Sequence, residues 1–327
     1  MSKDKRIFIT GGAGYIGSVL VRLLLDNNYS VIVFDNMRWG DESLSDVKNH
    51  PNLKIIKGDV TDEIEYKNAL SGVYGIVHLA AIVGDPACKK EPQIATDVNF
   101  IASKRLFETA KQSGVKRFIF ASTCSNYGKM AQANGYVNET SVLKPVSLYA
   151  QLKVDFENYI LNSKKQDDFI PISLRFATVY GISKRMRFDL TINEFVRDLY
   201  FGKELLVFGE KFWRPYCHVS DVGRACLLAL EAPQNKMSHE VFNVGETGEN
   251  YQKEMLIGEI NKFIKNTKVK YVPQNDDPRD YKVDFTKIKN VLGFKVTKRV
   301  PDGIQEIIDS LSRNILKDPF DKKYQNS

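Results

Sequence analysis

The sequence lacks the features that mark membrane, secreted and fibrous proteins. Nowhere in its 327 residues does an apolar run approach the ~18 consecutive residues of a membrane span. The N-terminus, MSKDKRIFIT, enters a short β-like run without the apolar core of a signal peptide. No repeat period or low-complexity tract occurs. We therefore expect a globular protein in the cytoplasm, with no membrane partner.

Cysteine is also scarce, and charge of one sign is not concentrated. Cys88, Cys124, Cys217 and Cys226 show no C-x-x-C spacing, so neither a metal site nor a disulfide framework is expected. The formal charge of +7 arises from 47 Lys+Arg against 40 Asp+Glu, and the basic residues are scattered. Because nucleic-acid readers usually carry a basic stripe on a recognisable module, no nucleic-acid partner is expected.

The first half of the chain alternates short apolar runs with helix-length segments. The runs are 6–10, 31–35, 53–57, 75–79, 117–121 and 172–176. Several of them are apolar throughout rather than alternating, as strands covered by helices on both faces must be. This pattern predicts an α/β fold, a Rossmann-type doubly wound parallel sheet.

The alternation breaks down after Thr178, where connections lengthen and Gly and Pro punctuate the chain. We expect a cofactor-binding domain over 1–177 and a smaller C-terminal substrate-binding lobe over 178–327, with 214–232 returning to the first domain. The last residues, KDPFDKKYQNS, are expected to form a polar, frayed tail.

A glycine-rich turn follows the first predicted strand. Gly12-Ala13-Gly14-Tyr15-Ile16-Gly17 satisfies G-x-G-x-x-G between a strand and a helix, where backbone N–H groups can approach a pyrophosphate. Asp35 ends the second strand, and a carboxylate there accepts hydrogen bonds from a ribose 2′-OH and repels a 2′-phosphate. NAD is thus favoured over NADP. Asp59, at another strand end, either meets the adenine or belongs to the start of a helix.

A second motif has the form Y-x-x-x-K. Tyr149 and Lys153 share one face of a helix, and Thr123 lies upstream at the end of the fifth predicted strand. A fixed ammonium group favours the phenolate of a tyrosine, whose pKa is ordinarily about 10. Combined with the dinucleotide motif, this spacing predicts Tyr149 as a catalytic acid/base.

With these motifs in place, the chain resembles the extended short-chain dehydrogenase/reductase family, in particular its nucleotide-sugar epimerases, dehydratases and reductases. The resemblance covers nearly the whole chain and is carried, in order, by TGGAGYIG, GDV, HLAA, VN, ASTCSNYG, YAQLK, LRFATVYG and RPYCHVSD. It implies hydride exchange between NAD and a sugar carbon, usually C4, of a substrate held through its nucleoside diphosphate.

The resemblance also implies roles for individual residues. Thr123 would hydrogen-bond the reacting sugar oxygen, Tyr149 would be the base, and Lys153 would bind the nicotinamide ribose. Arg214 would bind the diphosphate. The cofactor residues would be Gly11, Gly14, Tyr15, Ile16, Gly17, Asp35, Asn36, Asp59, Val60, Leu79, Ala80, Ala81, Asn99, Tyr149 and Lys153. Related enzymes pair the helices that correspond to 92–114 and 147–163, so a homodimer is expected.

Two departures from the family pattern bear on the reaction. Dehydratases of the family place an Asp-Glu pair after the catalytic Thr, where this chain has Cys124 and Ser125, so 4,6-dehydration is disfavoured. Many epimerases have Asn where this chain has Thr178. The substrate-binding residues predicted on this basis are Thr123, Cys124, Ser125 and Thr178.

The second lobe contributes basic residues suited to a diphosphate. Arg214 and Arg279 are the strongest candidates, because guanidinium groups make planar, bidentate contacts with phosphate oxygens. Lys184, Arg185 and Arg187 form either a ligand site that includes Arg187 or an exposed basic loop. Phe208, Trp213 and Tyr216 either stack on a base or pack in the interior, and His78 and His218 are expected in the core.

We thus expect an NAD-dependent nucleotide-sugar epimerase that transiently oxidises its substrate. Two alternatives remain open. A nucleotide-sugar reductase or 4-dehydrogenase would use the same three catalytic residues with net turnover of NAD(H). A catalytically silent NAD-sensing protein would keep the fold without needing an activated phenol. The sugar and the base are not encoded in these motifs.

Overall fold

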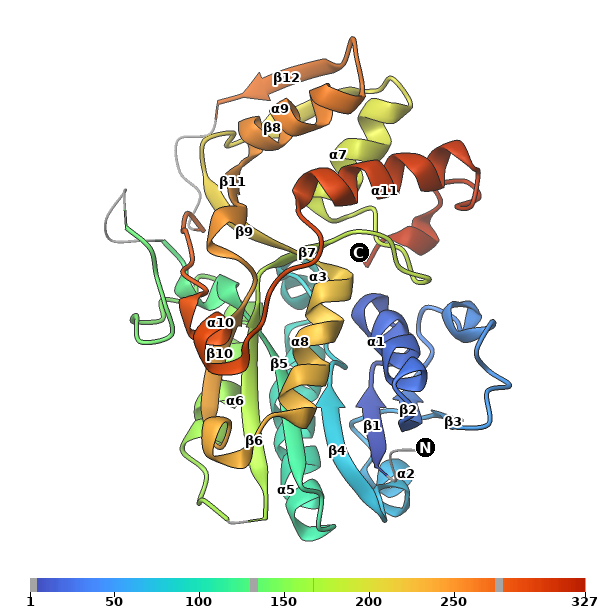
Figure 1. Ribbon diagram of the computed structural model, residues 1–327, viewed down its shortest axis with the longest axis vertical. Helices are drawn as coiled ribbons and strands as arrows, with labels where there is room; N and C mark the ends of the chain where they lie inside the picture. Colours follow the sequence, from blue (N-terminus) through green and yellow to red (C-terminus); the bar gives the residue numbers. More distant parts are fainter. Residues whose placement is uncertain (1–4, 130–134, 167, 274–278, 327) are drawn as a thin grey trace.

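The central element of the protein is a parallel β-sheet (Figure 1). The structure, a computed structural model, describes residues 5–129, 135–166, 168–273 and 279–326. Within these residues seven parallel strands pair in the order β10-β6-β5-β4-β1-β2-β3. They are β1 (Arg6–Thr10), β2 (Ser30–Asp35), β3 (Leu53–Lys57), β4 (Val73–His78), β5 (Arg117–Thr123), β6 (Ile170–Phe176) and β10 (Glu240–Val244). The order reverses between β1 and β4, which is the Rossmann-type topology and confirms the predicted fold class.

Successive side chains of β1 enter two separate cores. Ile7 and Ile9 join a cluster that includes Leu20 and Leu24 of the first helix, whereas Phe8 joins the cluster on the other face. Residues 7–10 are completely buried. A strand whose two faces are both covered has no position left for a polar side chain in water, which is why the run is apolar throughout.

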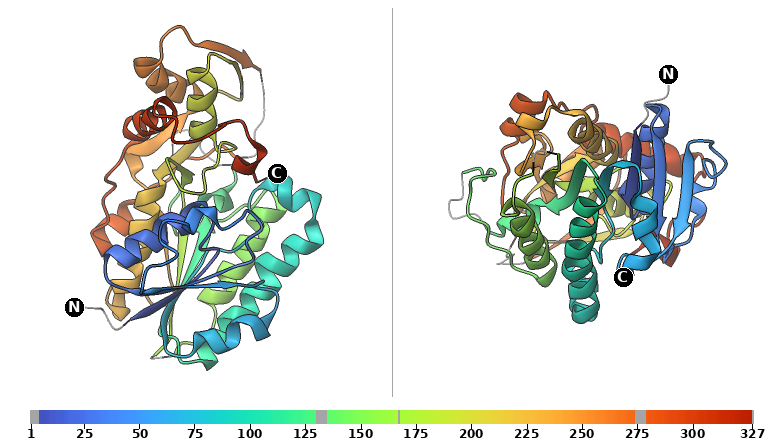
Figure 2. Two further views of the ribbon diagram at one scale, coloured as in Figure 1. Left: turned by 90° about the vertical axis from the view of Figure 1, so that its right-hand side faces the viewer. Right: turned by 90° about the horizontal axis from the view of Figure 1, so that it is seen from below.

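Helices cover both faces of the sheet (Figure 2). On one face lie α1 (Tyr15–Asp26) and α8 (Val219–Glu231), and on the other lie α5 (Ser103–Gln112) and α6 (Leu148–Leu161). The shorter helices of this part are α2 (Glu63–Lys67), α3 (Asp85–Lys90), α4 (Pro92–Thr96) and α10 (Thr286–Leu292), with a π-helical turn over Asp97–Ala102 and 3-10 turns over Glu42–Leu44, Asn68–Leu70, Cys124–Tyr127, Gln234–Lys236 and Thr247–Glu249.

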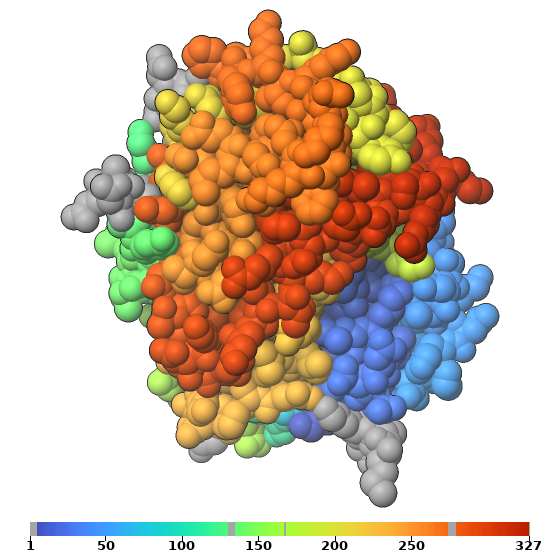
Figure 3. All heavy atoms as spheres, turned by 45° about the horizontal axis from the view of Figure 1, so that its top comes forward, coloured from blue at the N-terminus to red at the C-terminus, as the bar shows by residue number. Residues whose placement is uncertain are grey.

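A smaller lobe sits at the carboxyl ends of the strands. Its helices are α7 (Thr191–Tyr200), α9 (Lys253–Phe263) and α11 (Val300–Ser312), and its strands are β7 (Thr178–Tyr180), β8 (Glu204–Phe208), β9 (Trp213–His218), β11 (Asn250–Gln252) and β12 (Lys268–Val272). Phe195, Leu256 and Ile304 contribute to its own apolar core. Figure 3 shows the orange and red segments of this lobe against the blue N-terminal region.

The chain crosses between the two parts more than once. β10 lies at one edge of the main sheet and α8 packs on α1, although both come after residue 178. The apolar run of β10 is short and follows long connections, so the βαβ pattern of the first half does not extend to it. In the described residues, no helix is both long and apolar enough to cross a bilayer.

Candidate active site

A cavity of about 460 Å³ runs along the carboxyl ends of the strands and under the lobe. Open α/β sheets bind ligands at this edge, where the strand order reverses. The cavity brings together most of the residues that the sequence predicts. They are Gly11, Gly14, Tyr15, Ile16, Gly17, Asp35, Asn36, Asp59, Val60, Leu79, Ala80, Ala81, Thr123, Ser125, Tyr149, Lys153, Thr178, Arg187, Arg214 and Arg279.

The glycine turn forms one end of this cavity because only glycine fits there. Gly11 has φ +74°, and a Cβ at this position would lie 2.8 Å from the backbone nitrogen of Ala80. A Cβ on Gly17 would overlap the carbonyl oxygen of Gly11. Gly14 is the N-cap of α1 and provides no side-chain cap, and the first turn of α1 contains no acidic residue. The positive end of the helix dipole is therefore available to an anionic group, as a dinucleotide pyrophosphate requires.

Asp35 stands at the end of β2 in the same wall. Its two carboxylate oxygens accept hydrogen bonds from the backbone N–H groups of Ala13 (3.0 Å) and Met37 (2.9 Å). Burial raises the pKa of this carboxyl group, and the two backbone bonds oppose that effect. The carboxylate is thus held in place beside the glycine turn, where a ribose would meet it.

The sequence allows two interpretations of Asp59, an adenine contact or a position at the start of a helix. It lines the cavity, accepts a hydrogen bond from Asn36 (3.1 Å) and bonds Thr61. The N-cap of α2 is Asp62, which accepts from the backbone N–H of Ile64. Asp59 is therefore not the capping residue, and its position beside Asn36 fits the cofactor side of the cavity.

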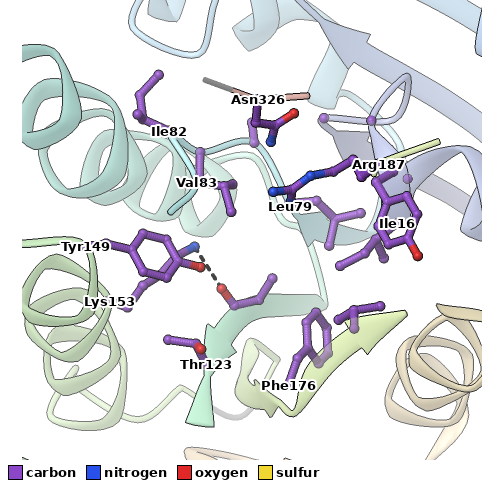
Figure 4. A pocket seen from close by; sticks show the side chains of 18 of the residues that line it. Ile16, Leu79, Ile82, Val83, Thr123, Tyr149, Lys153, Phe176, Arg187 and Asn326 are labelled. Carbon is purple, nitrogen blue, oxygen red and sulfur yellow. Dashed lines mark hydrogen bonds between the residues drawn. The ribbon is translucent and has the colours of Figure 1, made fainter. Parts of the chain in front are cut away.

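Thr123, Tyr149 and Lys153 face the cavity from β5 and α6 (Figure 4). Ser147 is the N-cap of α6 and fixes the start of the helix by accepting from the backbone N–H of Ala150. The Lys153 ammonium donates to the carbonyl oxygen of Ala121 (2.8 Å) and lies 5.9 Å from the centre of the Tyr149 ring. The helix and the strand end thus place a phenol, an ammonium and a hydroxyl around one space.

Burial dominates the electrostatics of this space. It raises the pKa of Tyr149 well above its usual range, with a smaller opposing effect from the charge of Arg187. Burial also lowers the pKa of Lys153 to about 8, because its ammonium is removed from water. Burial therefore favours the neutral form of each side chain, and a positive charge bound beside Tyr149 would oppose this effect and favour the phenolate.

Three arginines form the opposite, lobe side of the cavity. Arg187 makes a paired contact with the Asp189 carboxylate at 3.1 and 2.7 Å. Arg214 donates to the carbonyl oxygen of Trp213 (2.7 Å), and Arg279 donates to Asp85 (3.0 Å). Asp85 also accepts from Ser147, so a chain of hydrogen bonds joins Arg279 to the N-cap of the helix that carries Tyr149.

Two predicted residues lie outside the cavity wall. The 3-10 turn after β5 points Cys124 into the core, where it is 1% exposed and its thiol donates to the carbonyl oxygen of Arg175. Asn99 is also buried, and its amide makes two hydrogen bonds with the backbone of Ile82, a residue of the wall. Asn99 therefore holds a loop of the cavity wall without lining the cavity itself.

The basic loop divides between the two interpretations that the sequence allows. Lys184 is exposed and pairs with Asp46, whereas Arg185 and Arg187 line the cavity. Of the three aromatic candidates, Tyr216 lies in the wall, and Phe208 and Trp213 do not.

The two histidines near the site, His78 and His218, make contacts within the protein. His78 bonds Thr10 and Ser103, and His218 bonds Ser220 and Glu306, so both rings serve structural contacts. Within the part of the chain that the structure describes, no group of three metal-ligating side chains converges.

Several residues of the wall escaped sequence reasoning. They are Arg38, Trp39, Lys253, Tyr281 and Asn326. Trp39 follows Asp35 closely in the chain, so its position after β2 was a usable signal. Asn326 had none, since its segment has the composition of an exposed tail.

Comparisons with known proteins agree with this geometry. The model of the NAD dependent epimerase/dehydratase family matches residues 7–245. UDP-glucuronic acid decarboxylase 5 of Arabidopsis thaliana is 30% identical over 314 residues. The match covers 92% of this chain and 87% of the Arabidopsis protein.

Two solved structures extend the likeness to three dimensions. The structure of the Thermotoga maritima UDP-glucose 4-epimerase bound to UDP-glucose has a TM-score of 0.82 and 30% sequence identity. The match covers 95% of this chain and 99% of the Thermotoga chain. The structure of the Thermus thermophilus UDP-glucose 4-epimerase in complex with NAD has a TM-score of 0.81 and 25% sequence identity. The match covers 94% of this chain and 99% of the Thermus chain.

The family model spans the glycine turn, Asp35, Thr123, Tyr149 and Lys153 in one continuous match. The cavity offers the features that NAD needs: a glycine-lined helix N-terminus, a carboxylate at the end of β2, and a phenol–ammonium pair. This protein is an enzyme that uses NAD, and it belongs to the NAD-dependent epimerase/dehydratase family.

Proposed function

We propose that the protein is a nucleotide-sugar 4-epimerase whose substrate carries a uridine diphosphate. The observation that carries the proposal is the convergence of Thr123, Tyr149 and Lys153 with the lobe arginines in one cavity. Two of the similar solved proteins are UDP-glucose 4-epimerases, and both cover nearly the whole chain. UDP-glucose is thus the first substrate to test.

The lobe side of the cavity suits the diphosphate of such a substrate. Arg214 and Arg279 are permanently charged and present several donors in a plane, which matches phosphate oxygens. Arg279 is paired with Asp85 in the structure, so a diphosphate would compete with that carboxylate for the guanidinium. Binding energy gained there would hold the sugar against Thr123 and Tyr149.

The reaction assigned to these residues is an oxidation followed by its reversal. Tyr149 takes the proton of a sugar hydroxyl while Thr123 donates a hydrogen bond to the same oxygen. Bound beside Tyr149, NAD would supply the acceptor and donor of the hydride at the sugar carbon, and its positive charge would favour the Tyr149 phenolate. The keto sugar rotates in the cavity so that its other face receives the hydride. Tyr149 then returns the proton, and no net redox change remains.

Dehydration fits the site less well. Loss of water across two sugar carbons needs an acid and a base beside the catalytic threonine. The two following positions hold Cys124, which is buried in the core, and Ser125, a neutral hydroxyl in the wall. Neither residue supplies a carboxylate, which argues against dehydration and leaves epimerisation and net oxidoreduction as the two candidate reactions.

The test is to incubate the purified protein with UDP-glucose and, separately, UDP-glucuronic acid without added cofactor. Sugar configuration is followed by NMR and reduced nicotinamide by its absorbance. We expect a changed configuration at C4 without stoichiometric NADH. Formation of a keto or reduced sugar in step with cofactor conversion would instead identify a net oxidoreductase.

We also propose a homodimer formed through α4, the π-helical turn, α5 and α6. Ile94 and Ile101 are 46% and 45% exposed on this face, although they are large and apolar. A second copy would remove them from water. Light scattering at micromolar concentration should give twice the monomer mass, and a monomer would contradict the proposal.

A further inference from the structure

The last described residues are packed against the cavity rather than frayed. After α11 the chain turns back across the lobe, and its end lies near α1 and α3 (Figure 1). A short 3-10 turn over Lys322–Tyr324 leads into this end. The carbonyl oxygen of Tyr324 accepts from the backbone N–H of Phe188 (2.8 Å), and the two rings meet edge to face at 5.7 Å.

Arg185 is the main anchor of this segment. Its guanidinium donates to the carbonyl oxygen of Gln325 (3.1 Å) and to the side-chain oxygen of Asn326 (2.9 Å). The same group lies 4.7 Å from the centre of the Trp39 ring. Arg185 is only 6% exposed, so water does not replace these contacts easily. The end of the chain thus completes the surroundings of a buried cation.

The anchor and the cofactor side of the cavity are neighbours. Ser183, two residues before Arg185, bonds the carbonyl oxygen of Tyr15 and the hydroxyl of Ser18 at the start of α1. Trp39 follows Asp35 at the end of β2. Arg185 therefore shares the cavity wall with the start of α1 and with Trp39, on the cofactor side.

Asn326 itself lines the cavity. Its side chain lies beside Arg187 in Figure 4, and its backbone N–H points to the Asp189 carboxylate that also pairs with Arg187. The amide oxygen is taken by Arg185, and the amide nitrogen is the donor that this side chain can offer to a ligand. The adjacent dinucleotide has acceptors in its phosphates and ribose hydroxyls.

We propose that residues 324–326 are a strap of the cofactor site, in which Asn326 donates to bound NAD and, with Arg185, slows its release. An epimerase gains from such retention because it reuses the same cofactor in each cycle. The inference needs only NAD as the cofactor and is independent of the sugar that the enzyme accepts.

The test measures release of NADH without any nucleotide sugar. Protein loaded with NADH is mixed with excess NAD in a stopped-flow fluorimeter, and the dissociation rate is read from the loss of fluorescence. We expect Asn326→Ala to raise this rate about 3- to 10-fold, as one lost hydrogen bond would. A chain ending at Phe320 should release NADH at least about 10-fold faster.

Lys322→Ala is the matched control, since this neighbouring side chain is exposed and outside the cavity wall. It should release NADH at the wild-type rate. Thermal unfolding without cofactor should show at most the small loss of the Arg185 bond in Asn326→Ala, which separates a lost ligand contact from a damaged fold. If the shortened chain does not fold, Asn326→Ala decides. Wild-type or slower release from Asn326→Ala would overturn the proposal.

Discussion

The two sides of the cavity are built in different ways. The cofactor side consists largely of backbone: a continuous turn from Gly11 to Gly17 and the ends of neighbouring strands. The lobe side consists of charged side chains from distant segments, Arg187, Arg214 and Arg279, each bonded to another protein group. Backbone geometry is set by the fold itself, whereas the arginines depend on their partners. Changes at Arg214 or Arg279, which lie apart from the 324–326 strap, should therefore alter substrate binding without disturbing the cofactor.

Tyr149 belongs to the junction of the two sides, and its loss should have the largest effect. Tyr149→Phe removes one hydroxyl and leaves the ring that packs in the wall. We expect turnover to fall about 10²- to 10⁴-fold, with unchanged NAD affinity and unfolding temperature. Tyr159→Phe, on the same helix but with its hydroxyl bonded to Glu108, is the control and should keep activity. Wild-type turnover of Tyr149→Phe would remove this residue from the mechanism.

Arg214→Ala tests the lobe side alone. Loss of a charge-assisted contact should raise KM for the nucleotide sugar about 10- to 100-fold, while the NAD dissociation constant stays the same. Lys184→Ala is a matched loss of one exposed positive charge outside the wall and should change neither constant. The contrast between the two sides fails if Arg214→Ala weakens the binding of NAD as much as it weakens the binding of the nucleotide sugar.

Asp35→Ala tests the cofactor side alone. The variant loses the carboxylate that would meet the ribose and also the bonds to Ala13 and Met37. NAD affinity should fall about tenfold and the preference over NADP should narrow, because charged hydrogen bonds contribute about 1.5–3 kcal/mol. Calorimetry of both cofactors measures this, with Asp26→Ala as an exposed control. Equal binding of NAD and NADP by the wild-type protein would refute the role of Asp35.

The smallest effect concerns the contact between α11 and the end of β9. Glu306 on α11 accepts from His218 Nε2 (2.6 Å) and Lys298 (2.7 Å), and these donors lower its pKa to about 2. A carboxyl with a lowered pKa stabilises the fold above its unfolded-state value of about 4.3, and this contribution is lost as the pH falls toward 2. Glu306→Gln should cost about 1–2 kcal/mol at pH 7 and less at pH 3.

Thermal unfolding of Glu306→Gln and wild type across pH 3 to pH 7 measures this difference. Glu259→Gln, which removes an i,i+3 pair with the exposed Lys262, provides the comparison, and its stability difference should depend little on pH. A stability difference that stays constant with pH would show that the Glu306 charge is not what matters.

The same contrast explains what the sequence could predict. The strands 6–10 and 53–57 have the bounds that the sequence predicts, and the glycine turn is read from adjacent residues. These features depend on local spacing. Cys124 shows the limit even near a motif, because the turn after β5 places its thiol in the core, outside the cavity wall.

The lobe and the strap depend on contacts between residues far apart in the chain. Arg185 meets Asn326 across 141 positions, and Arg279 meets Asp85 across 194. Neither spacing carries a periodic signal, and a polar segment such as 317–327 has the composition of an exposed tail. The chemistry of guanidinium groups predicts that these arginines suit phosphate, but the sequence contains no pattern that indicates which protein groups hold them.

The central claim is that a hydride leaves one sugar carbon and returns to the same carbon from the other face. The most direct test supplies UDP-glucose deuterated at C4, without added cofactor, and analyses the product by mass spectrometry and NMR. Our account predicts a product of inverted C4 configuration that retains the deuterium. Inversion with loss of the label to solvent, or appearance of the label in released reduced nicotinamide without inversion, would contradict it.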